Sequence, residues 1–284
     1  RDLKEPAALA AFKDWLSGQD AYVFTMNGFP FGAFHGHVVK ADVHAPDWTT
    51  DTRVAYTLRL FDILVQLIPA GMDGGISTSP LAYRHWYTAT GGQWKTMRKQ
   101  ATRNIVRIAE YLVAVRRDRG MCLHLDIEPE PDGVLESGPE FIAWFEEELI
   151  PEGSEILAKR LGLTDLEAEQ ALKTHIRICY DVCHFALGYE DHAAVIAELG
   201  QRGIQIGKFQ VSAAVGAAMP PDNSDRQAIW KAFMAFDEPT YLHQVLARRQ
   251  DGSVLRFRDL PEAGVCLDDN QVAEWRAHFH VPVF

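Results

Sequence analysis

The sequence has few of the features that mark membrane, nucleic-acid-binding or disulfide-stabilised proteins. It contains no run of the roughly 18 to 20 apolar residues that a membrane-spanning helix requires. Its 28 lysines and arginines are outnumbered by 39 aspartates and glutamates, and the net charge of −11 argues against a nucleic-acid partner. The 4 cysteines form no CxxC pair, which argues against a zinc knuckle or a disulfide framework. We therefore expect a cytoplasmic protein without an integral membrane segment, acting on a small molecule.

What the sequence does contain is an alternation of helix and strand patterns along its whole length. This alternation, without a linker-like break in composition, predicts an α/β fold in which βαβ units form a mostly parallel sheet within a single domain over residues 1–284. Six strands suffice for an open doubly wound sheet, whereas a barrel of eight needs more. No GxGxxG follows a predicted strand, so a dinucleotide-binding sheet has no support. We predict helices near residues 5–17, 52–69, 92–117, 138–175, 190–201 and 225–235, and strands near 21–29, 74–80, 121–128, 176–182, 206–214 and 275–284.

One segment, residues 237–263, has no regular pattern and is too long for an ordinary connection. Long segments of this kind often serve as lids over active sites. We therefore expect this one to close over the mouth of the sheet or barrel, with Tyr241 and His243 facing a substrate.

Several predicted strands place polar side chains on one face, toward the end of the strand. Because successive residues of a strand point to opposite faces, one face collects acidic, amide and imidazole groups while the other stays apolar. In a parallel α/β protein, such a face at the carboxyl ends of the strands is where catalytic groups gather. The residues on this face are His124, Asp126 and Glu128 in HLDIE, Cys179 and Asp181 in ICYD, Lys208, Gln210 and Ser212 in KFQVS, and His278 and His280 in HFH.

Buried carboxylates are costly unless a cation or hydrogen bonds offset their charge. Oxygen ligands together with an imidazole suit a divalent metal ion such as Mn²⁺, Mg²⁺ or Zn²⁺. We predict that the ligands of such an ion are Glu128, Asp181, Gln210 and His280. The alternative is a hydrogen-bonded polar layer without a metal. His184, three residues after Asp181, either binds the same metal or holds a substrate hydroxyl.

The strand ends LDIEPEP and YDVCH, followed by the polar strand KFQVS, resemble the xylose isomerase-like barrels, a group of sugar isomerases and epimerases that also includes enzymes of the endonuclease IV type. More narrowly, FTMNGFPFGAFHG, HLDIEPEPDGVLE, YDVCHFALGYED, FDEPTYLHQV and HFHVPVF resemble the metabolite traffic proteins of the bacterial ebo cluster. The resemblance implies a TIM (β/α)8-type barrel. Since the chain begins without methionine and ends on a predicted strand, we expect this barrel to be incomplete at its termini.

The resemblance also implies a function, with two departures from the pattern. The epimerases carry a histidine where Gln210 stands and a second glutamate on the final strand, where this chain has His280. The expected activity is a metal-dependent isomerase or epimerase that acts on a sugar, sugar phosphate or cyclitol through an enediolate, with Glu128 and His184 as catalytic residues. The alternative is a metabolite-binding or trafficking protein that has lost the catalytic activity. A third function, DNA repair of the endonuclease IV type, is disfavoured by the excess of acidic residues. The expected substrate-binding residues are Asn27, Arg84, Trp86, Glu130, His184, Tyr241 and His243.

Overall fold

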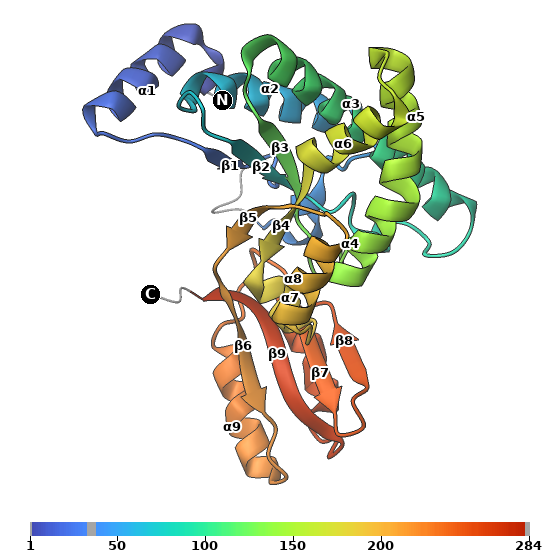
Figure 1. Cartoon of the computed structure of the whole chain (residues 1–284). Coiled ribbons are helices and arrows are strands. Elements are labelled where there is room, and N and C mark those ends of the chain that lie inside the picture. The colour runs from blue at the N-terminus through green and yellow to red at the C-terminus, as the bar shows by residue number, and fades with distance from the viewer. Residues whose placement is uncertain (1, 33–37, 282–284) are drawn as a thin grey trace.

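The computed structural model describes residues 2–32 and 38–281, with side chains placed for residues 3–32 and 38–279. Its upper half in Figure 1 is built on a parallel sheet with the strand order β1-β2-β3-β4-β5. Each strand pairs with the next along the chain, as expected for successive βαβ units. The strands are β1 (Thr25–Asn27), β2 (Gly74–Thr78), β3 (Leu123–Ile127), β4 (Ile176–Asp181) and β5 (Ile206–Gln210).

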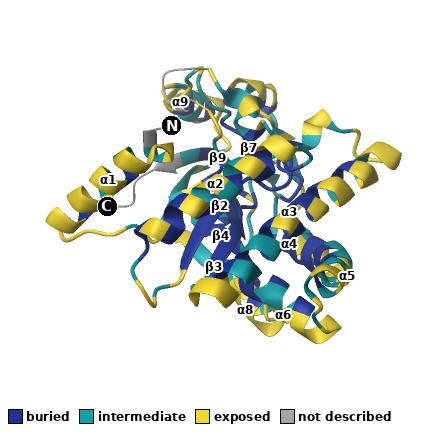
Figure 2. Cartoon of the chain, turned by 90° about the horizontal axis from the view of Figure 1, so that it is seen from above, coloured by how far each residue is buried: buried dark blue, intermediate teal, exposed yellow. Residues whose placement is uncertain are grey.

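Helices cover the outer face of this sheet, so that β2 and β3 are buried along their whole length. In Figure 2 the dark blue strands lie between helices whose outer surfaces are exposed. Several helix ends carry the expected signals: the Thr50 hydroxyl accepts from the Arg53 N–H, and Gly120 and Gly162 end their helices in the left-handed conformation. The helices connected to this sheet are α1 (Pro6–Gly18), α2 (Asp51–Leu67), α3 (Gly92–Arg119), α4 (Gly138–Trp144), α5 (Ile150–Leu161), α6 (Asp165–His175), α7 (Val182–Leu187) and α8 (His192–Gln201), with a π-helical turn η4 (Phe145–Leu149) and the 3-10 turns η1 (Asp2–Lys4), η2 (Lys40–His44) and η3 (Arg84–Trp86).

The parallel sheet is strongly curled, and its inner side is called the concave face below. Lys208 Nζ on β5 donates to Ser77 Oγ on β2 at 3.3 Å, although two strands separate them in the sheet. Gly207 lies where the β4–β5 register shifts, and a Cβ at this position would collide with Asp126. A bulge at a glycine thus permits the close approach of β5 to β3 that the curvature requires.

The sheet is therefore a half-barrel of five parallel strands. The expected α/β class and parallel sheet are observed, and the strands predicted at 74–80, 121–128 and 176–182 match β2, β3 and β4. A closed eight-stranded barrel is not present in the described part of the chain.

The lower half of Figure 1 is a four-stranded antiparallel sheet in the order β6-β9-β7-β8, which sequence analysis did not predict. The predicted strand 206–214 divides into β5 and the start of β6, and the final predicted strand pairs antiparallel with β6 and β7 rather than joining the parallel sheet. Trp275 is fully buried in the apolar cluster of this sheet. The elements are β6 (Ala213–Ala218), α9 (Asn223–Met234), β7 (Val245–Arg249), β8 (Val254–Phe257), η5 (Leu260–Cys266) and β9 (Val272–Val281).

The prediction that residues 237–263 are irregular is wrong, because they contain the hairpin β7–β8. The turn places Gly252 at a φ of 86°, and the Arg249 N–H donates to the Ser253 carbonyl at 2.8 Å. An Asp-Gly pair between β-branched and aromatic runs is a strong hairpin signal, and Asp251-Gly252 supplies it.

This segment packs against the loops that follow the parallel strands at their carboxyl ends. The Val39 N–H donates to the Thr240 carbonyl at 2.8 Å, and Gln244 Nε2 donates to the Pro131 carbonyl at 3.3 Å. The Tyr189 hydroxyl donates to the Leu246 carbonyl at 3.1 Å. The segment thus lies at the end of the half-barrel where the lid was expected, as part of an ordered sheet.

Among the described residues, no helix is both long enough and apolar enough to cross a membrane.

Candidate functional site

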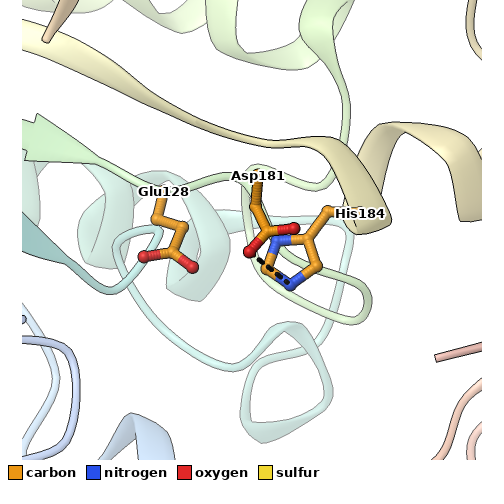
Figure 3. Close-up of side chains that lie close together, drawn as sticks. All are labelled: Glu128, Asp181 and His184. Carbon is orange, nitrogen blue, oxygen red and sulfur yellow. Dashed lines mark ion pairs between the residues drawn. The ribbon is translucent and has the colours of Figure 1, made fainter. Parts of the chain in front are cut away.

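Three of the predicted site residues meet at the carboxyl ends of neighbouring parallel strands. Glu128 follows β3, Asp181 ends β4, and His184 lies in the first turn of α7. One ligand atom from each lies within 4.8 Å of the others, and all three side chains are buried. Figure 3 shows the carboxylate of Asp181 beside the imidazole of His184, with Glu128 approaching from the end of β3. We call these residues the acidic cluster.

The local sequence explains why Asp181 and His184 lie together. The carboxylate of Asp181 accepts a hydrogen bond from the Cys183 N–H at 2.9 Å and so caps the N-terminus of α7. A residue three positions beyond a cap returns to the same side of the helix. His184 Nε2 consequently lies 4.0 Å from Asp181 Oδ2. The DxxH spacing thus places both groups at one point.

Gln210 on β5 joins the cluster as predicted, through its amide. Its Nε2 atom lies 2.6 Å from Glu128 Oε1 and 2.9 Å from Asp181 Oδ2, so that the amide bridges the two carboxylates. Ser212 donates to the other Asp181 oxygen at 2.6 Å. A metal ligand at this position requires the amide oxygen, which a rotation of the side-chain amide by 180° presents.

Glu128 is a buried carboxyl group with a raised pKa. Burial, and then the nearby charge of Asp181, raise the pKa of Glu128 to about 8. Among the described residues, no hydrogen-bond partner of good geometry reaches its buried Oε2 atom. A divalent ion beside this oxygen would offset the charge of both carboxylates, and two carboxylates with one imidazole are ligands that Mn²⁺ and Zn²⁺ accept.

His184 is oriented by the backbone before any ligand binds. Its Nδ1 atom lies 2.8 Å from the carbonyl oxygen of Pro129, in the loop after β3. Because a carbonyl oxygen only accepts hydrogen bonds, Nδ1 carries a proton, and Nε2 is the ring nitrogen that faces Asp181. This arrangement is common for histidines that bind metals.

Glu130 lies close enough to the acidic cluster to interact with it electrostatically. Burial raises the pKa of Glu130 well above its ordinary value, and the charges of Glu128 and Asp181 raise it further. The substrate-binding role of Glu130 stays a prediction.

The final strand contributes a histidine that sequence analysis noted on the polar face but did not select. The His278 ring lies edge-on to the His184 ring at a centroid distance of 4.9 Å, and its Nδ1 lies 2.8 Å from Gln244 Oε1. The side chain of His280, the predicted fourth ligand, lies outside the described residues. The two histidines stand two positions apart in the sequence, so strand alternation alone could not choose between them.

The other predicted substrate-binding residues contact groups outside the acidic cluster. Asn27, at the exposed end of β1, accepts a hydrogen bond from the Phe29 N–H, and the Arg84 guanidinium pairs with Glu136 and Glu140. Trp86 packs beside Tyr83 at a centroid distance of 5.7 Å.

Tyr241 and His243 belong to the segment that covers this end of the half-barrel. The Tyr241 N–H donates to Glu238 Oε1 at 2.8 Å. His243 is buried, stacks on Phe279 at 4.2 Å, and places its Nδ1 3.0 Å from the His278 carbonyl. His243 therefore supports the strand that carries His278.

A buried histidine in this loop layer predicts acid sensitivity. Burial, and then Arg53, lower the pKa of His44 to about 3, so the unfolded chain takes up a proton near pH 6.5 while the folded chain stays neutral. Stability is therefore lost as the pH falls below about 6.5. When the pH is lowered from 7.5 to 5.5, the free energy of unfolding should fall by about 1 kcal/mol less in His44→Gln than in wild type, because glutamine does not take up a proton. Urea unfolding at the two pH values measures this, and equal losses in both proteins would contradict it.

A comparison of the chain with known protein families finds no match, and a comparison with curated proteins finds none either. The interpretation of the site therefore rests on its geometry and chemistry.

Proposed function

We propose that the acidic cluster binds a divalent metal ion and that the protein is an isomerase or epimerase of the xylose isomerase-like kind, with the half-barrel as part of a TIM-type barrel. The observation that carries this proposal is the meeting of Glu128, Asp181 and His184 within 4.8 Å at the carboxyl ends of adjacent parallel strands. Ligand sites of α/β sheets lie at this end.

The residues around the cluster suit proton transfer next to a carbonyl group. A bound ion would polarise a substrate carbonyl and its neighbouring hydroxyl. Glu128 and Glu130 are carboxyl groups with raised pKa values, which brings them toward the range of a general acid or base near neutral pH. The Pro129 carbonyl holds the His184 ring in one orientation, so that this side chain can position a substrate hydroxyl. These roles fit an enediolate reaction of a sugar, sugar phosphate or cyclitol.

A second candidate is a metabolite-binding or trafficking protein on the same scaffold, as the resemblance to the ebo-cluster family suggests. It is favoured by the described part of the final strand, which brings the imidazole of His278, and no carboxylate among the described residues of that strand, against His184. Both candidates share a small polar ligand and no nucleic acid. All 4 cysteines are free thiols, which supports a cytoplasmic location for either candidate.

Metal content and proton exchange together test the proposal. Protein purified with Mn²⁺, Mg²⁺ and Zn²⁺ present and then dialysed should retain close to one equivalent of one of them. Incubation of the loaded protein with a panel of ketoses, aldoses and cyclitols in D₂O should incorporate deuterium next to the carbonyl of one substrate. Retained metal with binding but no exchange would favour the trafficking alternative. Absence of retained metal would contradict the metal centre itself.

A further inference from the structure

A lysine on the concave face lies close to the acidic cluster and forms no ion pair with any of the described side chains. Lys208 precedes Gln210 by two residues on β5 and shares its side of the strand, and Gln210 contacts both Glu128 and Asp181. Its ammonium group reaches across the concave face to Ser77 Oγ on β2. The bulge at Gly207 keeps Lys208 directed inward at this point of the strand.

The partners of Lys208 distinguish it from the other half-buried cations. Lys40 pairs with Asp259 at 2.7 Å, and Arg98 pairs with Glu148 at 2.6 Å. Among the described side chains, the one hydrogen bond of the Lys208 ammonium is to the neutral hydroxyl of Ser77, and no carboxylate forms an ion pair with it. Its position places the ammonium beside the cluster, because Gln210, on the same side of β5, contacts both carboxylates.

We propose that Lys208 is the internal countercharge of the acidic cluster and thereby sets its affinity for divalent ions. Without a metal, the ammonium offsets part of the negative charge of the acidic cluster. A divalent ion bound by these carboxylates lies near Lys208 and is repelled by it, so the lysine lowers the affinity for the ion. This inference rests on the proposed metal centre. In it Lys208 is not a ligand but acts on the ion through its charge.

A purely structural role for Lys208 predicts a different outcome. If the lysine only ties β5 to β2 through Ser77, its replacement changes the melting temperature and leaves metal affinity unchanged or weaker. If it is the countercharge, removal of the positive charge tightens metal binding. The sign of the change in affinity therefore separates the two roles.

The experiment is calorimetric titration of Mn²⁺ into wild type, Lys208→Met, Lys208→Arg and Lys159→Met at one pH and ionic strength. Lys159 is exposed on α5, so its replacement changes the net charge equally at a distance from the cluster. We expect Lys208→Met to bind Mn²⁺ about tenfold more tightly than wild type, and the other two variants to stay within about twofold of it. Unchanged or weaker binding by Lys208→Met would overturn the proposal.

A second neutral variant controls for misfolding of Lys208→Met. Lys208→Gln removes the charge but keeps a hydrogen-bond donor for Ser77, and the same tightening is expected of it. Misfolding of both neutral variants, seen by circular dichroism, would assign Lys208 a structural role and overturn the proposal. Failure of wild type and both neutral variants to bind Mn²⁺ would instead reject the metal centre, and the countercharge role with it. Binding by the neutral variants alone would support Lys208 as the countercharge.

Discussion

Glu128→Gln is expected to lower the affinity of the protein for Mn²⁺ by about tenfold or more, as loss of metal-site support generally does. The substitution keeps the volume of the side chain and one acceptor oxygen, but it removes a negative charge next to Asp181. The change should not unfold the protein. Burial and Asp181 raise the pKa of Glu128 to about 8, so above that pH the metal-free wild type carries a costly buried charge that glutamine lacks. Calorimetric titration with Mn²⁺ and thermal melts at pH 8.5 measure both effects.

The matched control for this prediction is Glu147→Gln, which makes the same chemical change at an exposed position of η4. It should leave the affinity for Mn²⁺ within about twofold of wild type, because an exposed charge is screened by solvent and salt. Equal affinities for wild type and Glu128→Gln would mean that the carboxylate is part of a hydrogen-bonded polar layer and not a ligand.

Arg226→Met is expected to lower the free energy of unfolding by about 3 kcal/mol or more, the largest effect on stability that we predict. The Arg226 guanidinium is buried, and its hydrogen bonds within the described part of the chain all go to backbone carbonyls. Methionine fills much of the same space but cannot donate, so buried carbonyls lose their partners at a cost of about 1 to 3 kcal/mol for each one left unsatisfied. The carbonyls belong to Pro220, Leu267, Asp269 and Val272.

Urea unfolding followed by circular dichroism measures this effect, with Arg160→Met as the control. Arg160 is exposed on α5 and forms one ion pair with Glu110, at 2.8 Å, so its loss should cost less than about 1 kcal/mol. Similar losses in the two variants would show that the buried hydrogen bonds of Arg226 contribute little to stability.

The two sheets differ in how far the sequence predicts them. Each strand of the half-barrel is a short apolar or alternating run followed or preceded by a helix. Acidic residues at the ends of two of them are unusual for buried strands: Asp126 lies in β3, and Asp181 ends β4. Such local signals predict the parallel βαβ order, because after a strand and a helix the chain usually forms the next strand beside the first and parallel to it. The strand order β1-β2-β3-β4-β5 is the simplest outcome of that rule.

The antiparallel sheet depends on contacts between segments far apart in the sequence. β6 pairs with β9 although more than 50 residues separate them. The sequence of β9 by itself predicts a further strand of the barrel. No local pattern states which of two sheets a strand joins, because both offer the same backbone hydrogen bonds. The hairpin turn at Asp251-Gly252 is the one signal for this sheet that the sequence carries and that our prediction missed.

The sequence by itself determined the chemistry of the site, whereas only the tertiary structure decided which groups meet. Strand alternation puts Glu128, Asp181, Lys208 and Gln210 on one face, and the DxxH spacing adds His184, because these relations depend on local backbone geometry. The choice of His278 as a neighbour of His184, the position of Glu130 and the reach of Lys208 to β2 depend on the curl of the sheet and on the packing of β9. Such distances arise from the packing of segments remote in sequence, and residue spacing along one strand does not encode them.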